Sequence, residues 1–129
     1  MRILKTMITM VLLTASFMAC KKDNDAEPAF AVPGKWEGAL IDGSNGATAF
    51  YGLLLNADGT LTRYKTTGEI LATGNWQLAG DSIKGSYQFS DGYTFSITGL
   101  VDKQKKKMTG TWGGGSNTKG LGSWNASKK

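Results

Sequence analysis

A three-residue pattern, Gly followed by any residue and then Trp, occurs four times in this chain. It contains all four tryptophans, at residues 34–36, 74–76, 110–112 and 122–124. Residues two apart in a β-strand point to the same face, so each unit places a missing side chain beside a large indole. A tightly curved sheet needs such vacancies next to bulky rings. The pattern therefore predicts a small β-barrel.

Turn signals rich in Gly, Asp and Asn divide the domain into eight short segments, as in an antiparallel meander. The expected strands are residues 34–41, 48–55, 60–66, 69–78, 82–89, 93–101, 106–112 and 119–125. The fourth to seventh alternate apolar and polar residues, as half-buried strands do. The fold class we expect is all-β, a single antiparallel eight-stranded up-and-down barrel, because closing the first strand on the eighth removes both sheet edges.

Side-chain alternation also predicts which residues face the interior, among them Ile70, Tyr93 and Gly120. Those that would line a ligand cavity are Trp36, Trp76, Tyr87, Phe95, Trp112 and Trp124. Many glycines share this face and leave either space for a ligand or room for the indoles; both alternatives stay open. Residues 48–55 are apolar on both faces, so one face either packs under a covering segment, for which residues 29–32 are the candidate, or forms an exposed apolar patch. The orientation of residues 60–66 is open, because Leu61 competes with Tyr64 for the interior.

The N-terminal stretch, residues 1–19, reads as a secretory signal. It has a basic head with Arg2 and Lys5, followed by an apolar run without acidic residues that is too short for a spanning helix. It ends at Ala19 and Cys20, which resembles a bacterial lipoprotein signal, in which the Cys is lipidated and becomes the first residue. Cys20 is the only cysteine in the chain, so no internal disulfide is available. The resemblance implies a membrane partner through acyl chains on Cys20.

Residues 20–32 are charged and without periodicity, which is typical of a flexible tether. Lys21 and Lys22 followed by acidic residues resemble the signal that follows the lipidated Cys in surface-exposed lipoproteins of Bacteroidota-type bacteria. A merely solvated spacer is an equal alternative. The resemblance implies a lipid-anchored protein of the outer membrane, with its outer face as the favoured side. The remaining residues, 33–129, form the barrel domain.

A Gly-x-Trp unit at the first of eight strands carries a second resemblance, which covers the barrel region only. The domain is similar to the lipocalins and their calycin relatives, and to small lipocalin-like lipoprotein domains of Bacteroidota. The resemblance implies a barrel whose mouth takes a small hydrophobic molecule.

Absent residue types limit the chemistry. The chain has no His, and its one Cys is expected to be acylated. Ser-His and Cys-His nucleophilic sites and the usual zinc ligand sets are thereby excluded. Most acids of the domain fall in predicted turns: Asp42, Asp58, Asp81, Asp91 and Asp102. Glu37 and Glu69 fall in predicted strands and face outward. We expect no enzyme, no cofactor and no metal site.

Charge gives one further feature. The formal net charge of the chain is +5, and the one dense basic group is Lys103 with residues 105–107. A solvated hairpin tip explains this group, and attraction to phosphates of an outer-membrane glycolipid is the alternative. Exposed aromatics for stacking on nucleic acid are lacking there, so nucleic acid is not an expected partner. We expect a monomer.

Two functional hypotheses follow. In the first, the protein is a non-catalytic outer-membrane lipoprotein whose barrel binds a hydrophobic small molecule or a glycan. In the second, it is a structural or interaction lipoprotein with a filled barrel, whose loops at residues 42–47 and 113–119 bind or inhibit a partner protein. A cavity of several hundred Å³ would favour the first, and a packed interior the second.

Overall fold

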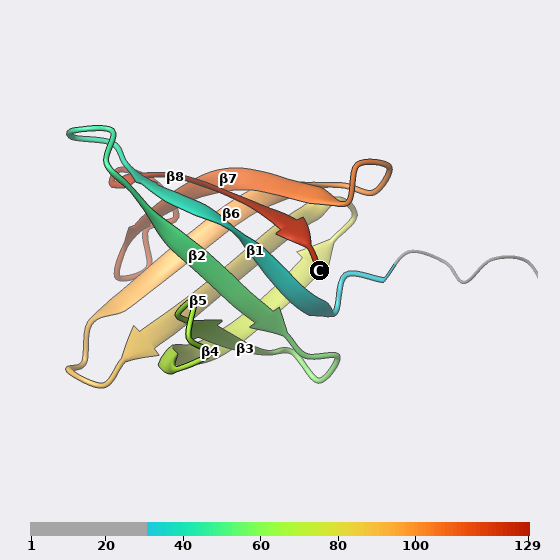
Figure 1. Cartoon of the computed structure of the whole chain (residues 1–129), viewed down its shortest axis with the longest axis horizontal. Coiled ribbons are helices and arrows are strands. Elements are labelled where there is room, and N and C mark those ends of the chain that lie inside the picture. The colour runs from blue at the N-terminus through green and yellow to red at the C-terminus, as the bar shows by residue number, and fades with distance from the viewer. Residues whose placement is uncertain (1–30) are drawn as a thin grey trace, which may run out of the picture. The chain divides into compact units, whose positions relative to one another are not determined.

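A single sheet closes on itself to form the domain (Figure 1). The structure, a computed structural model, describes residues 31–129, which form one compact unit. Its strands are β1 (Gly34–Asp42), β2 (Thr48–Leu55), β3 (Thr60–Tyr64), β4 (Ile70–Ala79), β5 (Ser82–Phe89), β6 (Thr94–Asp102), β7 (Lys107–Gly114) and β8 (Gly122–Lys128). Each pairs antiparallel with the next, and β1 pairs with β8. The predicted closed up-and-down barrel is confirmed, while the signal, Cys20 and most of the tether lie outside the described residues.

Most strand bounds agree with the prediction to within two residues, but β8 begins three residues late. The preceding loop folds back over the outer face of the sheet, where Ser96 Oγ donates to the Gly115 carbonyl at 2.6 Å and Thr111 Oγ1 to the Thr118 carbonyl at 2.8 Å. Gly120, expected inside the barrel, lies in this loop with φ of +110°. Glu69, expected in a strand, lies in the turn before β4.

The barrel has two distinct ends. One, which we call the terminal end, carries the start of β1, the end of β8 and the β2–β3, β4–β5 and β6–β7 turns. The other, which we call the mouth, carries the β1–β2, β3–β4, β5–β6 and β7–β8 connections. In Figure 1 the terminal end faces right, where the described chain begins and the C-terminus lies.

The half of the interior near the terminal end is a packed apolar core. Its fully buried side chains include Trp36, Leu53, Leu55, Leu61, Ile83, Ile97 and Met108. Trp36 Nε1 donates to the Val32 carbonyl at 2.8 Å, which draws the entering chain across this end. Lys128 Nζ lies 5.9 Å from the centre of the Trp36 ring and donates to the Pro33 carbonyl at 2.9 Å. Together these contacts cover the core from solvent.

The outer face of β2 is covered differently from the prediction. Residues 29–32 were expected to lie on it, but Val32 lies across the barrel end and residues 29–30 are outside the described part. Tyr64 covers it instead: its ring lies 6.2 Å from that of Phe50, and its hydroxyl donates to Glu37 Oε2 at 2.9 Å. Tyr64 therefore faces outward and Leu61 inward, which resolves the orientation of β3.

Three of the four indoles lie opposite a glycine of the neighbouring strand. In the cross-strand register Trp76 pairs with Gly85, Trp112 with Gly122 and Trp124 with Gly110. The two interior tyrosines follow the same rule, since Tyr51 pairs with Gly38 and Tyr87 with Gly74. A ring lying over a cross-strand glycine shields backbone that the glycine leaves bare.

In three of the four patterns the glycine also allows close approach of two backbones. A methyl group added to Gly74, Gly110 or Gly122 would overlap a carbonyl oxygen of the adjacent strand. Such close approach is typical of the tightly curved sheet of a small barrel. The idea that these glycines make room for the Trp of the same strand was therefore wrong for these three.

Replacement of Gly110 by Ala should destabilise the barrel, because the added methyl overlaps the Thr98 carbonyl. We expect the free energy of unfolding to fall by about 1–3 kcal/mol, measured by urea denaturation. Gly114→Ala on the same strand is the matched control, since its nearest contact would be Leu121 Cδ1 at 3.8 Å. Equal stabilities of the two variants would contradict the close-approach argument.

Candidate functional site at the barrel mouth

The side-chain alternation of β3 places an arginine inside the barrel. Leu61 pairs with Leu55 and Arg63 with Leu53, and all four face the interior. Only 9% of Arg63 is exposed. Sequence reasoning missed Arg63 as a functional residue, although the signal was present: if Leu61 faces inward, so does the residue two positions later.

The Arg63 guanidinium lies among aromatic rings. Its Cζ atom is 5.0 Å from the centre of the Tyr51 ring, 5.6 Å from that of Tyr87 and 5.4 Å from that of Phe89. Such cation–π contacts offset part of the lost hydration of the charge. They do not replace hydrogen bonds in the plane of the guanidinium.

No carboxylate in residues 31–129 pairs with this cation. The ion pairs of that part of the chain join Lys65 with Glu69, Lys103 with Asp81 and Lys129 with Glu37. Arg63 Nε is buried and has no hydrogen-bond partner. A buried charge without a counter-charge is strongly unfavourable. The interior thus holds a positive charge that residues 31–129 leave uncompensated.

Two tyrosine hydroxyls lie beside the guanidinium. The Tyr51 and Tyr87 hydroxyl oxygens are 3.0 Å apart and share a hydrogen bond. Burial raises the pKa of Tyr51 well above its usual value of 10, and burial also raises the pKa of Tyr87, against the opposing effect of Arg63. Both phenols are therefore protonated at neutral pH and can donate hydrogen bonds.

Aromatic rings continue from these tyrosines to the edge of the mouth. Tyr87 lies 5.8 Å from Phe89 and 6.3 Å from Phe95, and Phe95 lies 5.6 Å from Trp112. A hollow of about 310 Å³ opens here, lined by Phe89, Asp91, Tyr93 and Phe95. The mouth is thus an apolar vestibule above a buried cation.

Exposed apolar side chains form its rim. Tyr93 is 69% exposed and Ile70 is 63% exposed, although alternation had placed both inside the barrel. Tyr93 lies just before β6, and Ile70 is the first residue of β4, where it pairs with Tyr64 next to a β-bulge that interrupts the alternation of side chains.

The structure brings together four of the six predicted lining residues and separates two. Phe95, Tyr87 and Trp112 belong to the mouth, and Trp124 lies 5.8 Å from Tyr51 below it. Trp36 belongs to the packed core at the terminal end. Trp76 is half-buried near the same end, with Nε1 donating to the Asn56 carbonyl at 2.8 Å. That any of the six contacts a ligand stays a prediction.

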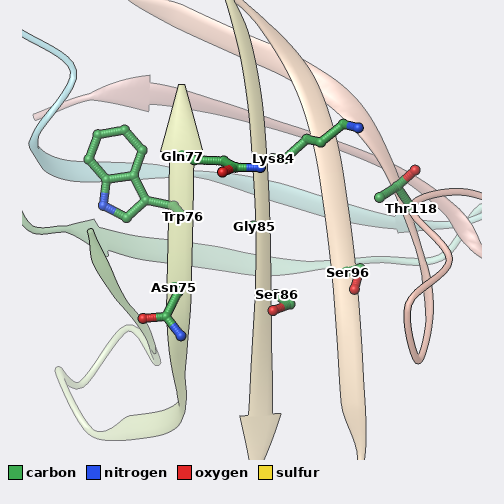
Figure 2. Close-up of a pocket in the computed structure, with 8 residues that line it drawn as sticks. All are labelled: Asn75, Trp76, Gln77, Lys84, Gly85, Ser86, Ser96 and Thr118. Atoms are coloured by element: carbon green, nitrogen blue, oxygen red, sulfur yellow. The ribbon is translucent and has the colours of Figure 1, made fainter. Parts of the chain in front are cut away.

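A second hollow of about 300 Å³ lies on the outer face of the barrel (Figure 2). Its lining comprises Asn75, Trp76, Gln77, Lys84, Gly85, Ser86, Ser96 and Thr118. Figure 2 shows the Trp76 ring directed away from Gln77 and Lys84, so the groove presents amides, hydroxyls and an ammonium. Ser96 already donates to Gly115. Unlike the mouth, this second hollow contains no buried side-chain nitrogen or oxygen that lacks a hydrogen-bond partner.

The described part of the chain, residues 31–129, has neither a cluster of metal ligands nor a helix that could span a membrane. No group of three or more His, Cys, Asp or Glu side chains there is placed to hold a metal ion. Within the same range no helix is long and apolar enough to cross a bilayer. Comparison of the chain with protein-family models, curated proteins and solved structures finds no match.

Replacement of Arg63 by Met should stabilise the protein, because it removes a buried charge without a counter-charge and keeps much of the side-chain volume. We expect the free energy of unfolding to rise by about 1 kcal/mol or more. Lys65→Met, an exposed cation just after β3, should change it by less than about 0.5 kcal/mol. A marked loss of stability in Arg63→Met would instead make Arg63 a structural residue.

Proposed function

We propose that the protein is a non-catalytic binding module that takes a small amphipathic molecule into the mouth of its barrel. The observation that carries this proposal is Arg63, a buried cation without a counter-charge behind an apolar rim. A ligand with an anionic head group and a hydrophobic tail matches both features. Of the two ligand classes that the sequence suggested, the hydrophobic molecule is therefore favoured over the glycan.

Recognition of the head group would use three groups of the mouth. The Arg63 guanidinium can form charge-assisted hydrogen bonds with a carboxylate, and the Tyr51 and Tyr87 hydroxyls can donate to it. Arg63 is the only buried cation among residues 31–129, which suits a monoanion better than a dianion. When a carboxylate hydrogen-bonds to the Arg63 guanidinium, the buried Arg63 Nε gains the hydrogen-bond partner that it lacks.

Recognition of the tail would use Phe89, Phe95 and the exposed rim residues Tyr93 and Ile70. Their burial contributes about 25 cal/mol per Å² of apolar surface removed from water. Because only 9% of Arg63 is exposed, entry of a head group requires the half-buried Phe89 and Phe95 to turn aside. The packed core near the terminal end limits how deep a tail can reach.

A second candidate function is binding of a partner protein through the loops at the mouth. The loop at residues 42–47 lies beside the chain that follows the loop at residues 113–119, since Gly43 N donates to the Leu121 carbonyl at 2.8 Å. The packed interior near the terminal end also favours this alternative. It does not explain the uncompensated Arg63.

We also propose that the barrel belongs to a small lipocalin-like lipoprotein, anchored through Cys20 in the outer membrane. Support for the lipocalin likeness comes from the up-and-down order of eight strands and from the buried Trp36 in β1. Support for the anchor comes from the sequence of residues 1–32 alone.

Dodecanoate should bind the protein saturably at one to one, measured by calorimetry on residues 20–129 with Cys20→Ser. Arg63→Met should weaken dodecanoate binding by about tenfold or more, since a hydrogen bond to a charged group contributes about 1.5–3 kcal/mol. Dodecanol has the same tail and no charge, so the Arg63→Met substitution should change its affinity little. Lys65→Met is the control for non-specific attraction of anions.

Failure of both dodecanoate and dodecanol to bind the wild-type protein would reject the mouth as a ligand site and direct attention to the loops. Equal binding of the two ligands, unaffected by Arg63→Met, would leave an apolar site without a role for the cation.

Cys20→Ser should move the protein from the membrane fraction to the soluble fraction of the cells that export it, because acyl chains supply the attachment. Fractionation followed by mass spectrometry of the N-terminal peptide measures both location and lipidation. A wild-type peptide without acyl chains would contradict the anchor.

A further inference from the structure

Charge is divided unevenly between the two ends of the barrel. Within residues 31–129 the half at the terminal end carries eight lysines: Lys35, Lys84, Lys103, Lys105, Lys106, Lys107, Lys128 and Lys129. The same half carries four acids: Glu37, Asp58, Asp81 and Asp102. The mouth half balances, with Arg63, Lys65 and Lys119 against Asp42, Glu69 and Asp91. The whole positive excess of the described chain therefore lies at the terminal end.

Four of these lysines lie in or next to the β6–β7 turn, which has an unusual backbone. Lys106 has φ of +54° and is the only non-glycine residue with a positive φ in the described part of the chain. Every other inter-strand connection has a glycine with positive φ: Gly46, Gly59, Gly68, Gly80, Gly92 and Gly115. A residue with a Cβ atom is less stable than glycine in this region. The β6–β7 turn thus carries a lysine where a glycine would be less strained.

Most charges of this turn are not neutralised within the described residues. Lys103 pairs with Asp81 at 3.4 Å, whereas Lys105, Lys106 and Lys107 are exposed and form no ion pair with residues 31–129. Asp102 is occupied by the turn itself, since its Oδ1 accepts from the backbone N–H groups of Gln104 and Lys105.

An exposed apolar side chain lies among these lysines. Leu100, on the outer face of β6, is 63% exposed. It lines a hollow of about 680 Å³ with the three lysines Lys103, Lys105 and Lys107 and the two carboxylates Asp81 and Asp102. An apolar residue framed by lysines is typical of surfaces that lie on a membrane, where the ammonium groups reach the head groups and the apolar part enters the interface.

The position of this surface also fits a membrane as its partner. Ala31 lies at the terminal end, where its carbonyl accepts a hydrogen bond from Lys128 Nζ, and only residues 21–30 separate it from Cys20. The eleven residue-to-residue steps from Cys20 to Ala31 span at most about 40 Å when fully extended. A bilayer that holds an acylated Cys20 is thus within reach of this end of the barrel.

We propose that the terminal end is a membrane-docking surface, which binds the phosphate groups of an anionic bilayer through Lys103, Lys105, Lys106 and Lys107. Docking in this orientation turns the mouth with Arg63 away from the membrane. A basic patch next to a lipid anchor gives the two-signal attachment that holds a protein stably on a bilayer. The docking itself does not depend on a ligand in the mouth.

Vesicle co-sedimentation tests the electrostatic contact without the anchor. Residues 20–129 with Cys20→Ser should bind phosphatidylcholine vesicles that contain phosphatidylglycerol and not those of phosphatidylcholine alone. Binding should disappear between about 0.1 M and 1 M salt, where the Debye length falls from about 10 Å to 3 Å. Absence of binding to the anionic vesicles at low salt would overturn the proposal.

Matched charge reversals separate position from net charge. Lys105→Glu with Lys107→Glu should lower binding to anionic vesicles by about tenfold or more. Lys65→Glu with Lys119→Glu at the mouth gives the same net charge and should lower it much less. Equal losses in the two double variants would show attraction by net charge only and would overturn the docking surface.

The orientation is tested on the full lipidated chain in anionic vesicles. A single fluorophore is attached at Gln104→Cys in the β6–β7 turn or at Ser90→Cys at the mouth, with Cys20 blocked by its acyl chains. A quencher carried on lipid head groups should quench the label at residue 104 several-fold more than the label at residue 90. Equal quenching, or stronger quenching at residue 90, would overturn the proposed orientation.

Discussion

Closure of eight short strands into a narrow barrel is the constraint on which the structure depends. Strands in such a barrel must bend, and bending brings backbones so close that a Cβ atom no longer fits at Gly74, Gly110 and Gly122. The bare backbone is then shielded by rings from the neighbouring strands. Glycine and aromatic residues are therefore one packing system, which explains why a chain of modest apolar content forms a closed sheet without a disulfide.

This system divides the interior into two unlike halves. Towards the terminal end, Trp36 and aliphatic side chains fill the space, and the entering chain with Lys128 covers it. Towards the mouth, rings surround Arg63, which no described carboxylate neutralises. The packed core near the terminal end therefore provides most of the folding stability of the barrel. The unfavourable burial of a charge can persist at the mouth only because the other half of the barrel is well packed.

The outer surface repeats this division in its charges. Lysines gather at the terminal end, while the mouth half is balanced and carries exposed apolar residues on its rim. In the proposed arrangement, one end of the barrel faces the bilayer and the other faces the surroundings from which a ligand comes. The two proposals are physically separate, because they involve different ends and different interactions.

The sequence by itself determined the strand order, the closed barrel and most inward positions, because side-chain alternation and Gly-rich turns are local properties. It did not determine the loop before β8, which folds back through hydrogen bonds to β6 and β7, nor the exposure of Ile70, which lies next to a β-bulge, and of Tyr93, which lies just before β6. The surroundings of Arg63 were also decided only by the tertiary structure. The inward direction of Arg63 follows from alternation once Leu61 is known to face inward. The absence of a counter-charge near Arg63 depends on which strands surround it, and the closed sheet decides that.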